Sequence, residues 1–154
     1  MNLKKPHILL ATWFGSGLSP KAPGTCGSLA AIPPGLALAA LGGIPALIAG
    51  IAVITALGFW AAKKFDEEQK SHDSKMIVID EVAGQWIALI AAGLNPVSIT
   101  LSFVLFRLFD ILKPWPVSHF DKNVKGAGGV MGDDIVAGIL TLLCLKGMQY
   151  AGII

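Results

Sequence analysis

The longest stretch without a charged side chain runs from Ala22 to Ala62, and it limits what this chain can fold into. It is too long for one helix, and residues that favour turns interrupt it at Pro33-Pro34-Gly35 and again at Gly42-Gly43-Ile44-Pro45. We therefore predict two apolar helices, about Gly27–Leu41 and Ile44–Ala62, which a tight turn joins. The first helix is expected to be short or kinked, because it contains both prolines.

The composition of the whole chain favours a membrane environment for these helices. Hydrophobic residues make up 54% of the 154 residues and charged residues 14%, whereas charged residues make up about 25% of ordinary soluble domains. A soluble domain needs polar side chains to cover its surface, but a surface in contact with lipid does not. The sequence therefore predicts an integral membrane protein, with a compact soluble helical protein as the alternative.

Three further apolar segments follow the first two. They are Met76–Leu94, Val97–Leu112 and Val130–Leu145, and the charged stretches 63–75 and 113–129 between them are expected to be polar loops. Some segments are shorter than the roughly 20 residues that a helix needs to cross a bilayer. We expect an all-α fold, an integral membrane bundle of about five apolar helices, in a single domain that covers residues 1–154.

Lysine and arginine lie almost entirely on one side of the expected bundle. If the helices alternate in direction, both polar loops face the same side as the N-terminus, and only Lys146 of the twelve Lys and Arg residues lies on the other side. Short loops rich in these residues stay in the cytoplasm. We therefore expect a multi-pass protein with a cytoplasmic N-terminus.

Five acidic residues fall at helix ends on that same side. Asp80 and Glu81 lie in the first turns of the third segment, Asp110 in the last turn of the fourth, and Asp133 and Asp134 in the first turn of the fifth. Acids at helix N-termini complement the helix dipole, which is the simplest alternative for the two pairs. It does not account for Asp110 at a C-terminus, or for ionised groups beside lipid, where each is costly unless paired or hydrated. We interpret the five acids as one functional site near the cytoplasmic interface.

The chemistry of this set indicates a hard divalent cation. Carboxylate oxygens without histidine or thiolate partners suit Mg²⁺ or Mn²⁺ better than zinc or copper. All five acids are therefore candidate metal ligands and catalytic residues, with Mg²⁺ as the expected cofactor. The number of ions, and which acids hold them, stays open at this point.

Basic and hydroxyl groups on the same side are candidates for binding phosphate. Arg107 and Lys113 flank Asp110 at intervals of three residues, so all three share one helix face. Either the three residues form a local row of ion pairs, or Arg107 and Lys113 act as a pair of cations that binds phosphate. The sequence APGTCGS before the first helix offers backbone amides and the hydroxyls of Thr25 and Ser28, although a plain turn is the simpler interpretation.

Missing motifs narrow the chemistry further. The chain has neither a GxxxxGK[ST] P-loop nor a CxxxxxR phosphatase loop, and it has no basic tract typical of nucleic-acid binding. We expect no nucleic-acid partner and no obligate protein partner. Among the histidines, His72 is a secondary candidate for the site. Once these designs are excluded, the residues fit a site in which a metal ion assists reaction of a phosphate ester.

Three stretches of the sequence resemble the phosphatidylglycerophosphatase A family: FGSGLSPKAPGTCGSLAAIP (14–33), HDSKMIVIDEVAGQWIAL (72–89) and FRLFDILKPWPVSHFDKNVKGAGGVMGDDIVAG (106–138). They cover nearly half of the chain in the order of the family. The resemblance implies a magnesium-dependent phosphatase of the bacterial inner membrane that converts phosphatidylglycerophosphate to phosphatidylglycerol and phosphate. It places the family's motifs on Asp80 and Glu81, on Arg107, Asp110 and Lys113, and on Asp133 and Asp134, and Thr25, Ser28 and Asp73 also match family positions.

Two other classes of function stay open. A small cation or proton-coupled transporter would spread its acids through the depth of the membrane. A soluble helical phosphohydrolase would act on a water-soluble phosphomonoester. For the reaction itself, attack by water and an aspartyl-phosphate intermediate both fit the residues, and we favour water because it needs fewer assumptions.

Overall fold

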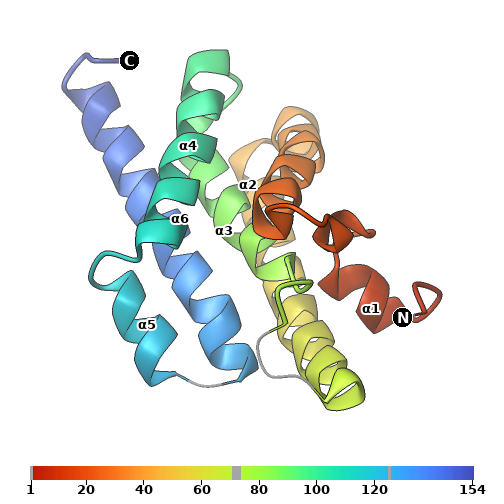
Figure 1. The fold of residues 1–154 in the computed structure, drawn as a ribbon. Helices are drawn as coiled ribbons and strands as arrows, with labels where there is room; N and C mark the ends of the chain where they lie inside the picture. Colours follow the sequence, from red (N-terminus) through yellow and green to blue (C-terminus); the bar gives the residue numbers. More distant parts are fainter. Residues whose placement is uncertain (1, 71–73, 125) are drawn as a thin grey trace.

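The computed structural model describes residues 2–70, 74–124 and 126–154, and within them the fold is entirely helical (Figure 1). Its helices are α1 (Pro6–Ala11), α2 (Pro23–Gln69), α3 (Ile79–Ala92), α4 (Pro96–Leu112), α5 (Val117–Asn123) and α6 (Ala127–Tyr150), with a 3-10 turn at Ser16–Leu18. The all-α prediction is confirmed. The five expected apolar segments correspond to the two arms of α2 and to α3, α4 and α6, whereas the sequence pattern does not predict α1 and α5.

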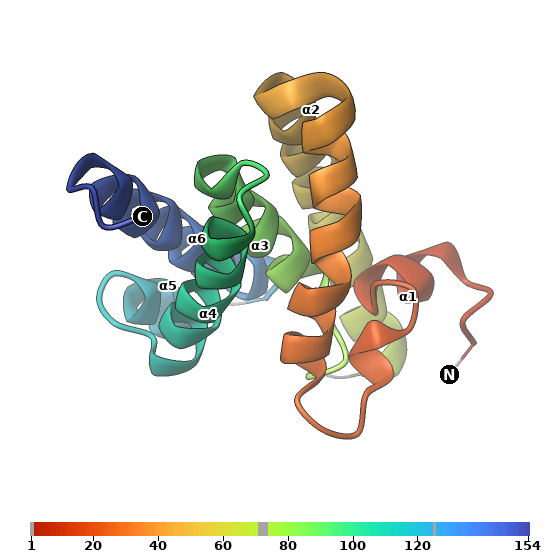
Figure 2. The ribbon, with the colours of Figure 1, turned by 90° about the horizontal axis from the view of Figure 1, so that it is seen from above.

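Helix α2 folds back on itself at Gly43 (Figure 2). This glycine has φ 68° and ψ −165°, a conformation that residues with a side chain disfavour, and it lies within the predicted turn. The two arms pack so closely that a Cβ on Gly50 would lie 2.7 Å from Leu38 Cδ1. The backbone stays helical through the two central prolines, so the first arm runs unbroken from Pro23 to the turn and is longer than predicted.

Helix α3 lies at the centre of the bundle, where it packs against α2, α4 and α6. Twelve of its fourteen residues are buried. Its crossing with α6 is close because glycines meet there: a Cβ on Gly138 would lie 2.4 Å from the carbonyl oxygen of Gly84, and a Cβ on Gly84 would lie 2.5 Å from that of Asp134. Small residues allow helix backbones to approach in this way. The crossing therefore sets the start of α3 beside the acidic turn of α6.

The start of α2 is also fixed against α3. The indole Nε1 of Trp86 donates a hydrogen bond to the carbonyl oxygen of Ala31 at 2.7 Å. A Cβ on Gly27 would lie 2.7 Å from Cβ of Val78, which leaves room for no larger residue there. These contacts bring the first turns of α2 and α3 side by side.

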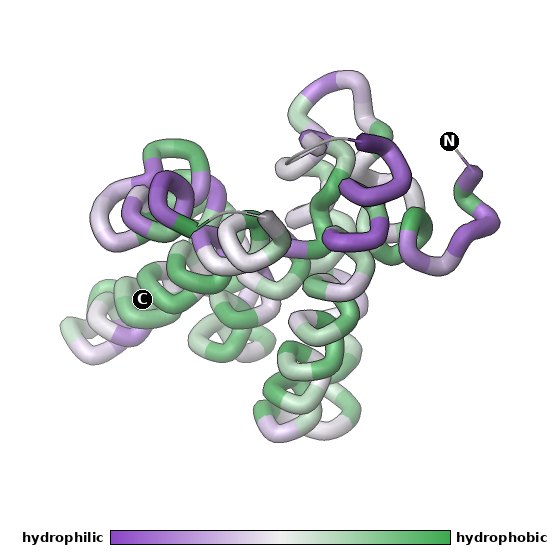
Figure 3. Tube along the Cα trace, turned by 90° about the horizontal axis from the view of Figure 1, so that it is seen from below, coloured by the Kyte–Doolittle hydropathy of each residue, from purple (hydrophilic) through white to green (hydrophobic). Residues whose placement is uncertain are grey.

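Two helices of the described chain, α2 and α6, are long and apolar enough to cross a membrane. Only 11% of the most apolar window of α2 is buried, against 44% for α6, so the apolar residues of α2 face outward. Figure 3 shows hydrophilic residues gathered along one side of the trace and hydrophobic residues on the helices that extend away from it. These features indicate a membrane-associated protein. Because α3 and α4 have only 14 and 17 residues, a bundle of five full spans is not confirmed.

Both stretches predicted as polar loops contain helix, and these predictions are wrong. Residues 63–69 continue α2, because the run KKFDEEQ combines strong helix formers with Phe65, whose side chain is fully buried. The stretch after α4 contains α5, and α6 extends from Ala127 to Tyr150. Asp133 and Asp134 consequently lie beyond the first turn of α6, not within it as predicted. The helix dipole acts mainly on the first turn, so it does not explain this pair.

Candidate active site

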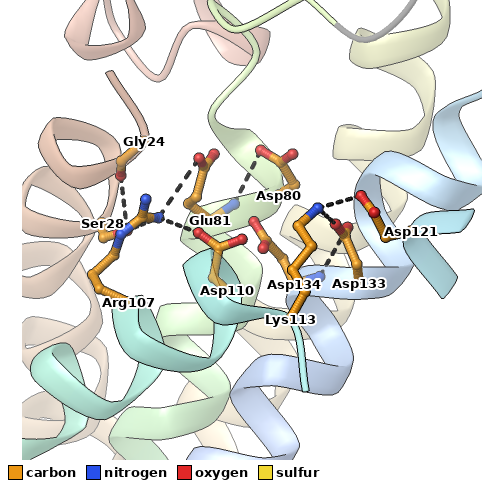
Figure 4. Close-up of polar contacts among 10 residues, drawn as sticks. All are labelled: Gly24, Ser28, Asp80, Glu81, Arg107, Asp110, Lys113, Asp121, Asp133 and Asp134. Atoms are coloured by element: carbon orange, nitrogen blue, oxygen red, sulfur yellow. Dashed lines mark hydrogen bonds and ion pairs between the residues drawn. The ribbon is translucent and has the colours of Figure 1, made fainter. Parts of the chain in front are cut away.

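A cavity of about 990 Å³ opens where the first turn of α2, the start of α3, the end of α4 and the first half of α6 meet. In the described part of the chain, its charged lining consists of six carboxylates (Asp80, Glu81, Asp110, Asp121, Asp133 and Asp134) and three cations (Lys75, Arg107 and Lys113). The five acids singled out from the sequence thus line one cavity, and Figure 4 shows their side chains gathered between α3, α4 and α6. With every group ionised, six acids against three bases give this lining a formal charge of −3.

The acids form two overlapping groups with the spacing of metal ligands. Asp80, Glu81 and Asp134 each offer a carboxylate oxygen within 4.8 Å of the others, and Asp110, Asp133 and Asp134 do the same. Asp134 is 3% exposed. Among the described residues, neither Asp80 nor Asp134 forms an ion pair with a basic side chain. Asp134 is the one residue that belongs to both groups.

Burial governs the protonation of the two acids at the start of α3. It raises the pKa of the Asp80 carboxyl well above its ordinary value, and the adjacent Glu81 adds to the shift. Burial also raises the pKa of Glu81, a shift that the Arg107 guanidinium opposes in part. Glu81 Oε2 is buried and has no hydrogen-bond partner in the described chain. Close, buried carboxyl groups with few counter-charges fit a divalent cation, which stabilises their ionised forms.

Contacts with three helices position Arg107 beside these acids. Its Nη1 lies 2.6 Å from Asp110 Oδ2 and 3.7 Å from Glu81 Oε1, and it donates a hydrogen bond to Ser28 Oγ at 3.3 Å (Figure 4). A Cβ on Gly24 would lie 2.1 Å from Glu81 Oε1 and 3.0 Å from Arg107 Nη2, so a side chain at this point of α2 would displace both charged groups. The three helices α2, α3 and α4 therefore fix the guanidinium in one place.

Lys113 joins α4 to α5 and α6. Its Nζ lies 2.7 Å from Asp133 Oδ2 and also pairs with Asp121. Burial alone lowers the pKa of the Lys113 ammonium, but the hydrogen bonds to Asp121 and Asp133 outweigh it, and the pKa lies above its ordinary value. Sequence reasoning missed Asp121 because it lies in a stretch interpreted as loop. Its one sequence signal is its place within the stretch 106–138.

The two candidate hydroxyls at the start of α2 differ in position. Thr25 lines the cavity, whereas Ser28 is buried behind it, where it donates to the carbonyl oxygen of Gly24 at 2.8 Å and accepts from Arg107. The segment predicted as a loop is the first turn of α2, and no side chain caps it. The first amides of a helix lack intrahelical partners and attract anions. The other two candidates, His72 and Asp73, lie outside the described residues.

Comparison with known proteins shows which family the chain resembles. The sequence model described as phosphatidylglycerophosphatase A matches residues 9–149. The chain is 41% identical to an Escherichia coli protein named phosphatidylglycerophosphatase A, over 92% of this chain and 82% of the relative. It is 39% identical to a Haemophilus influenzae protein of the same name, over 97% of this chain and 93% of the relative.

A third relative carries a different name. The chain is 39% identical to a Bacteroides thetaiotaomicron protein over 96% of this chain and 98% of that protein, whose name assigns it provisionally as a phosphatidylinositol-3-phosphatase. No solved structure matches the chain.

Proposed function

The chain belongs to the phosphatidylglycerophosphatase A family and is a phosphatase, and we propose that it hydrolyses phosphatidylglycerophosphate to phosphatidylglycerol and phosphate with the help of Mg²⁺. The observation that carries this proposal is the cavity in which five acids from three helices face Arg107, Lys113 and the start of α2. Such a site combines oxygen ligands for a cation with positive groups for a phosphate.

Asp80, Glu81, Asp110, Asp133 and Asp134 are the residues that would hold Mg²⁺. The two groups of oxygens within 4.8 Å, the buried Glu81 Oε2 without a partner and the absence of histidine or cysteine among these ligands support this assignment. When bound, Mg²⁺ supplies Lewis-acid chemistry, in that it withdraws charge from phosphoryl oxygens and lowers the pKa of coordinated water.

The phosphate of the substrate is proposed to lie against Arg107, Lys113 and the first turn of α2. Arg107 offers a fork of donors that matches two phosphate oxygens, and its contacts to Asp110 and Ser28 hold that fork in place before substrate arrives. Thr25 adds a hydroxyl at the cavity wall, and the N-terminus of α2, in which it lies, adds backbone amides. These donors would stabilise the charge that develops on the phosphoryl oxygens in the transition state.

An acid of the same site is proposed to accept the proton of the attacking water. Asp133 and Asp110 are placed for this task, because both line the cavity, and their carboxylates lie beside Lys113 and Arg107, the groups proposed to hold the phosphate. Direct attack by water is the version we propose, and an aspartyl phosphate is its rival. Acid quenching during turnover of substrate labelled in the phosphate separates the two, because only the rival leaves label on the protein.

The rim of the cavity supports a lipid as substrate. Ile111 lines the cavity and is 66% exposed, and Leu112 and Trp115 next to it are 68% and 80% exposed. Apolar side chains that stay exposed beside a charged cavity suit acyl chains that remain in the membrane. We propose that α2 and α6 anchor the chain in the bacterial inner membrane as a multi-pass protein, with its N-terminus and active site on the cytoplasmic side, as the distribution of lysines suggests.

A phosphate on an inositol ring is the second candidate substrate, and the name of the Bacteroides relative is what favours it. Both lipids present a phosphomonoester on a polar head group, so the same acids and cations would serve either one. The gathering of the acids at one cavity favours both over a transport pathway, in which acids would follow the depth of the membrane.

Phosphate release from purified protein in detergent micelles tests the proposal. The assay compares phosphatidylglycerophosphate, phosphatidylinositol 3-phosphate and water-soluble glycerol 3-phosphate, each with Mg²⁺ and with EDTA. We expect release from phosphatidylglycerophosphate that EDTA abolishes and Mg²⁺ restores. Asp80→Asn should abolish it, whereas Glu67→Gln, an exposed acid on α2 outside the cavity, should not. No release in Mg²⁺ contradicts the proposed activity, and a preference for glycerol 3-phosphate contradicts the lipid substrate.

A further inference from the structure

We propose that the cavity holds two divalent cations that share Asp134: one bound by Asp80, Glu81 and Asp134, and a weaker one bound by Asp110, Asp133 and Asp134. This inference deepens the proposed function and rests on it for the role of the cations in phosphate hydrolysis. It concerns the number of ions, their relative affinities and the residue that joins them.

Asp134 is placed to join two sites. It is the one acid with oxygens within 4.8 Å of both partners in each group, and at 3% exposure its carboxylate is more than nine-tenths buried. In the described part of the chain it forms no ion pair with lysine or arginine. A buried carboxylate without a counter-charge costs several kcal/mol, and two adjacent cations compensate it. The Gly84–Gly138 contact prevents the residue from moving away from α3.

The formal charge of the described lining favours more than one divalent ion. With the six acids and three bases among its described residues ionised, the lining carries −3, so one divalent cation leaves −1 and two give +1. A phosphomonoester carries about −1.5 to −2 at neutral pH. It would meet net repulsion in the first case and attraction in the second. Paired metal ions about 3.5–4 Å apart are a recurring solution in phosphatases.

The two sites are not equivalent, because the cations of the protein contact one of them more closely than the other. Asp110 and Asp133 are already paired with Arg107 at 2.6 Å and with Lys113 at 2.7 Å. In the other group, Asp80 has no such partner in the described chain, and Glu81 has only the longer 3.7 Å contact to Arg107. The first ion should therefore enter between Asp80, Glu81 and Asp134, and the second should bind more weakly.

Binding of Mn²⁺ without substrate tests this arrangement independently of activity. Titration calorimetry on the purified chain in detergent should show two ions per chain, with affinities that differ about tenfold or more. Electron paramagnetic resonance of the protein with both sites filled should show spin coupling between the two ions. Asp133→Asn should keep the tighter ion and lose the coupling, Asp134→Asn should lose the coupling and weaken both ions, and Glu67→Gln should bind like the unmodified chain.

Several results would overturn the inference: one Mn²⁺ per chain at saturation, two ions without spin coupling, or a coupled pair that survives in Asp134→Asn. Circular dichroism of each variant checks that it is folded, and the count on the unmodified chain needs no variant. The outcome is separable from that for the proposed function. A chain that binds a coupled pair but releases no phosphate contradicts the function, whereas a chain that releases phosphate with a single ion contradicts only the pair.

Discussion

Replacing Gly138 by alanine should separate α3 from α6 and disable the site without touching any acid. The added Cβ would lie 2.4 Å from the carbonyl oxygen of Gly84 and 3.0 Å from its Cα. Ordinary contacts begin at about 3.5 Å, so the helices must move apart by about 1 Å. Both atoms belong to the backbone, which cannot swing aside as a side chain would. We expect a loss of about 1–3 kcal/mol in unfolding free energy.

The activity should fall further than the stability, because Asp134 lies one helical turn before Gly138 and moves with it away from Asp80 and Glu81. A displacement of about 1 Å in a catalytic group costs roughly 100-fold in rate. The assays are phosphate release from phosphatidylglycerophosphate and thermal unfolding, both in detergent.

The matched control is Gly147→Ala on the same helix, where a new Cβ meets no atom within 4 Å. It should keep full activity and gain up to about 1 kcal/mol from the better helix propensity of alanine. If Gly138→Ala behaves like Gly147→Ala in rate and in unfolding temperature, the close crossing does not position the site.

Arg107→Lys keeps the charge but loses the fork, so kcat/KM should fall about 10- to 100-fold; an unchanged value would exclude a bidentate role. Ile111→Ser should raise KM for the long-chain lipid about fivefold and leave KM for a short-chain soluble analogue unaffected. The control Val104→Ser, at an exposed position elsewhere on α4, should change neither KM. Equal effects of Ile111→Ser on both substrates would show that Ile111 does not contact the acyl chains. Lys113 has a raised pKa in the folded protein, so its stabilising ion pairs persist below its ordinary pKa of about 10.4 and are lost only as pH rises through the higher folded value. Lys113→Gln should therefore lower the unfolding temperature equally at pH 7 and pH 9, and a difference that vanishes at pH 9 would contradict this assignment.

The functional acids were accessible to sequence reasoning because ionised groups are rare beside long apolar runs. Asp110 was the most informative of them, since no dipole argument accounts for an acid at a helix C-terminus. The prediction that Asp133 and Asp134 lie in a first turn failed because Gly128 and Gly129 are weak helix formers and indicate a loop in the sequence pattern. In the structure this segment is helical, and a Cβ on Gly129 would lie 2.1 Å from the carbonyl oxygen of Val124. That contact is not visible in local propensity.

The positions of Asp121 and Ser28 in the site could not be predicted from local sequence patterns. Asp121 was interpreted as part of a solvated loop, yet α5 carries it into the cavity, where it shares Lys113 with Asp133. Ser28 was a candidate phosphate ligand, yet it lies behind Arg107 and accepts a hydrogen bond from it. Both outcomes depend on contacts between residues far apart in the chain, and a helical or loop pattern contains no information about such contacts.

The sequence by itself determined the helical class, the turn near Gly43 and the collection of acids and cations on one side, because apolar periodicity, glycine and proline positions and charge spacing are local properties. Only the tertiary structure decided which acids share a cation site and which are paired with the protein's own cations. That choice depends on distances of a few ångströms, which the crossing at Gly84 and Gly138 sets. At such distances electrostatic energies change steeply with position, so the same five acids acquire different roles once the helices have packed.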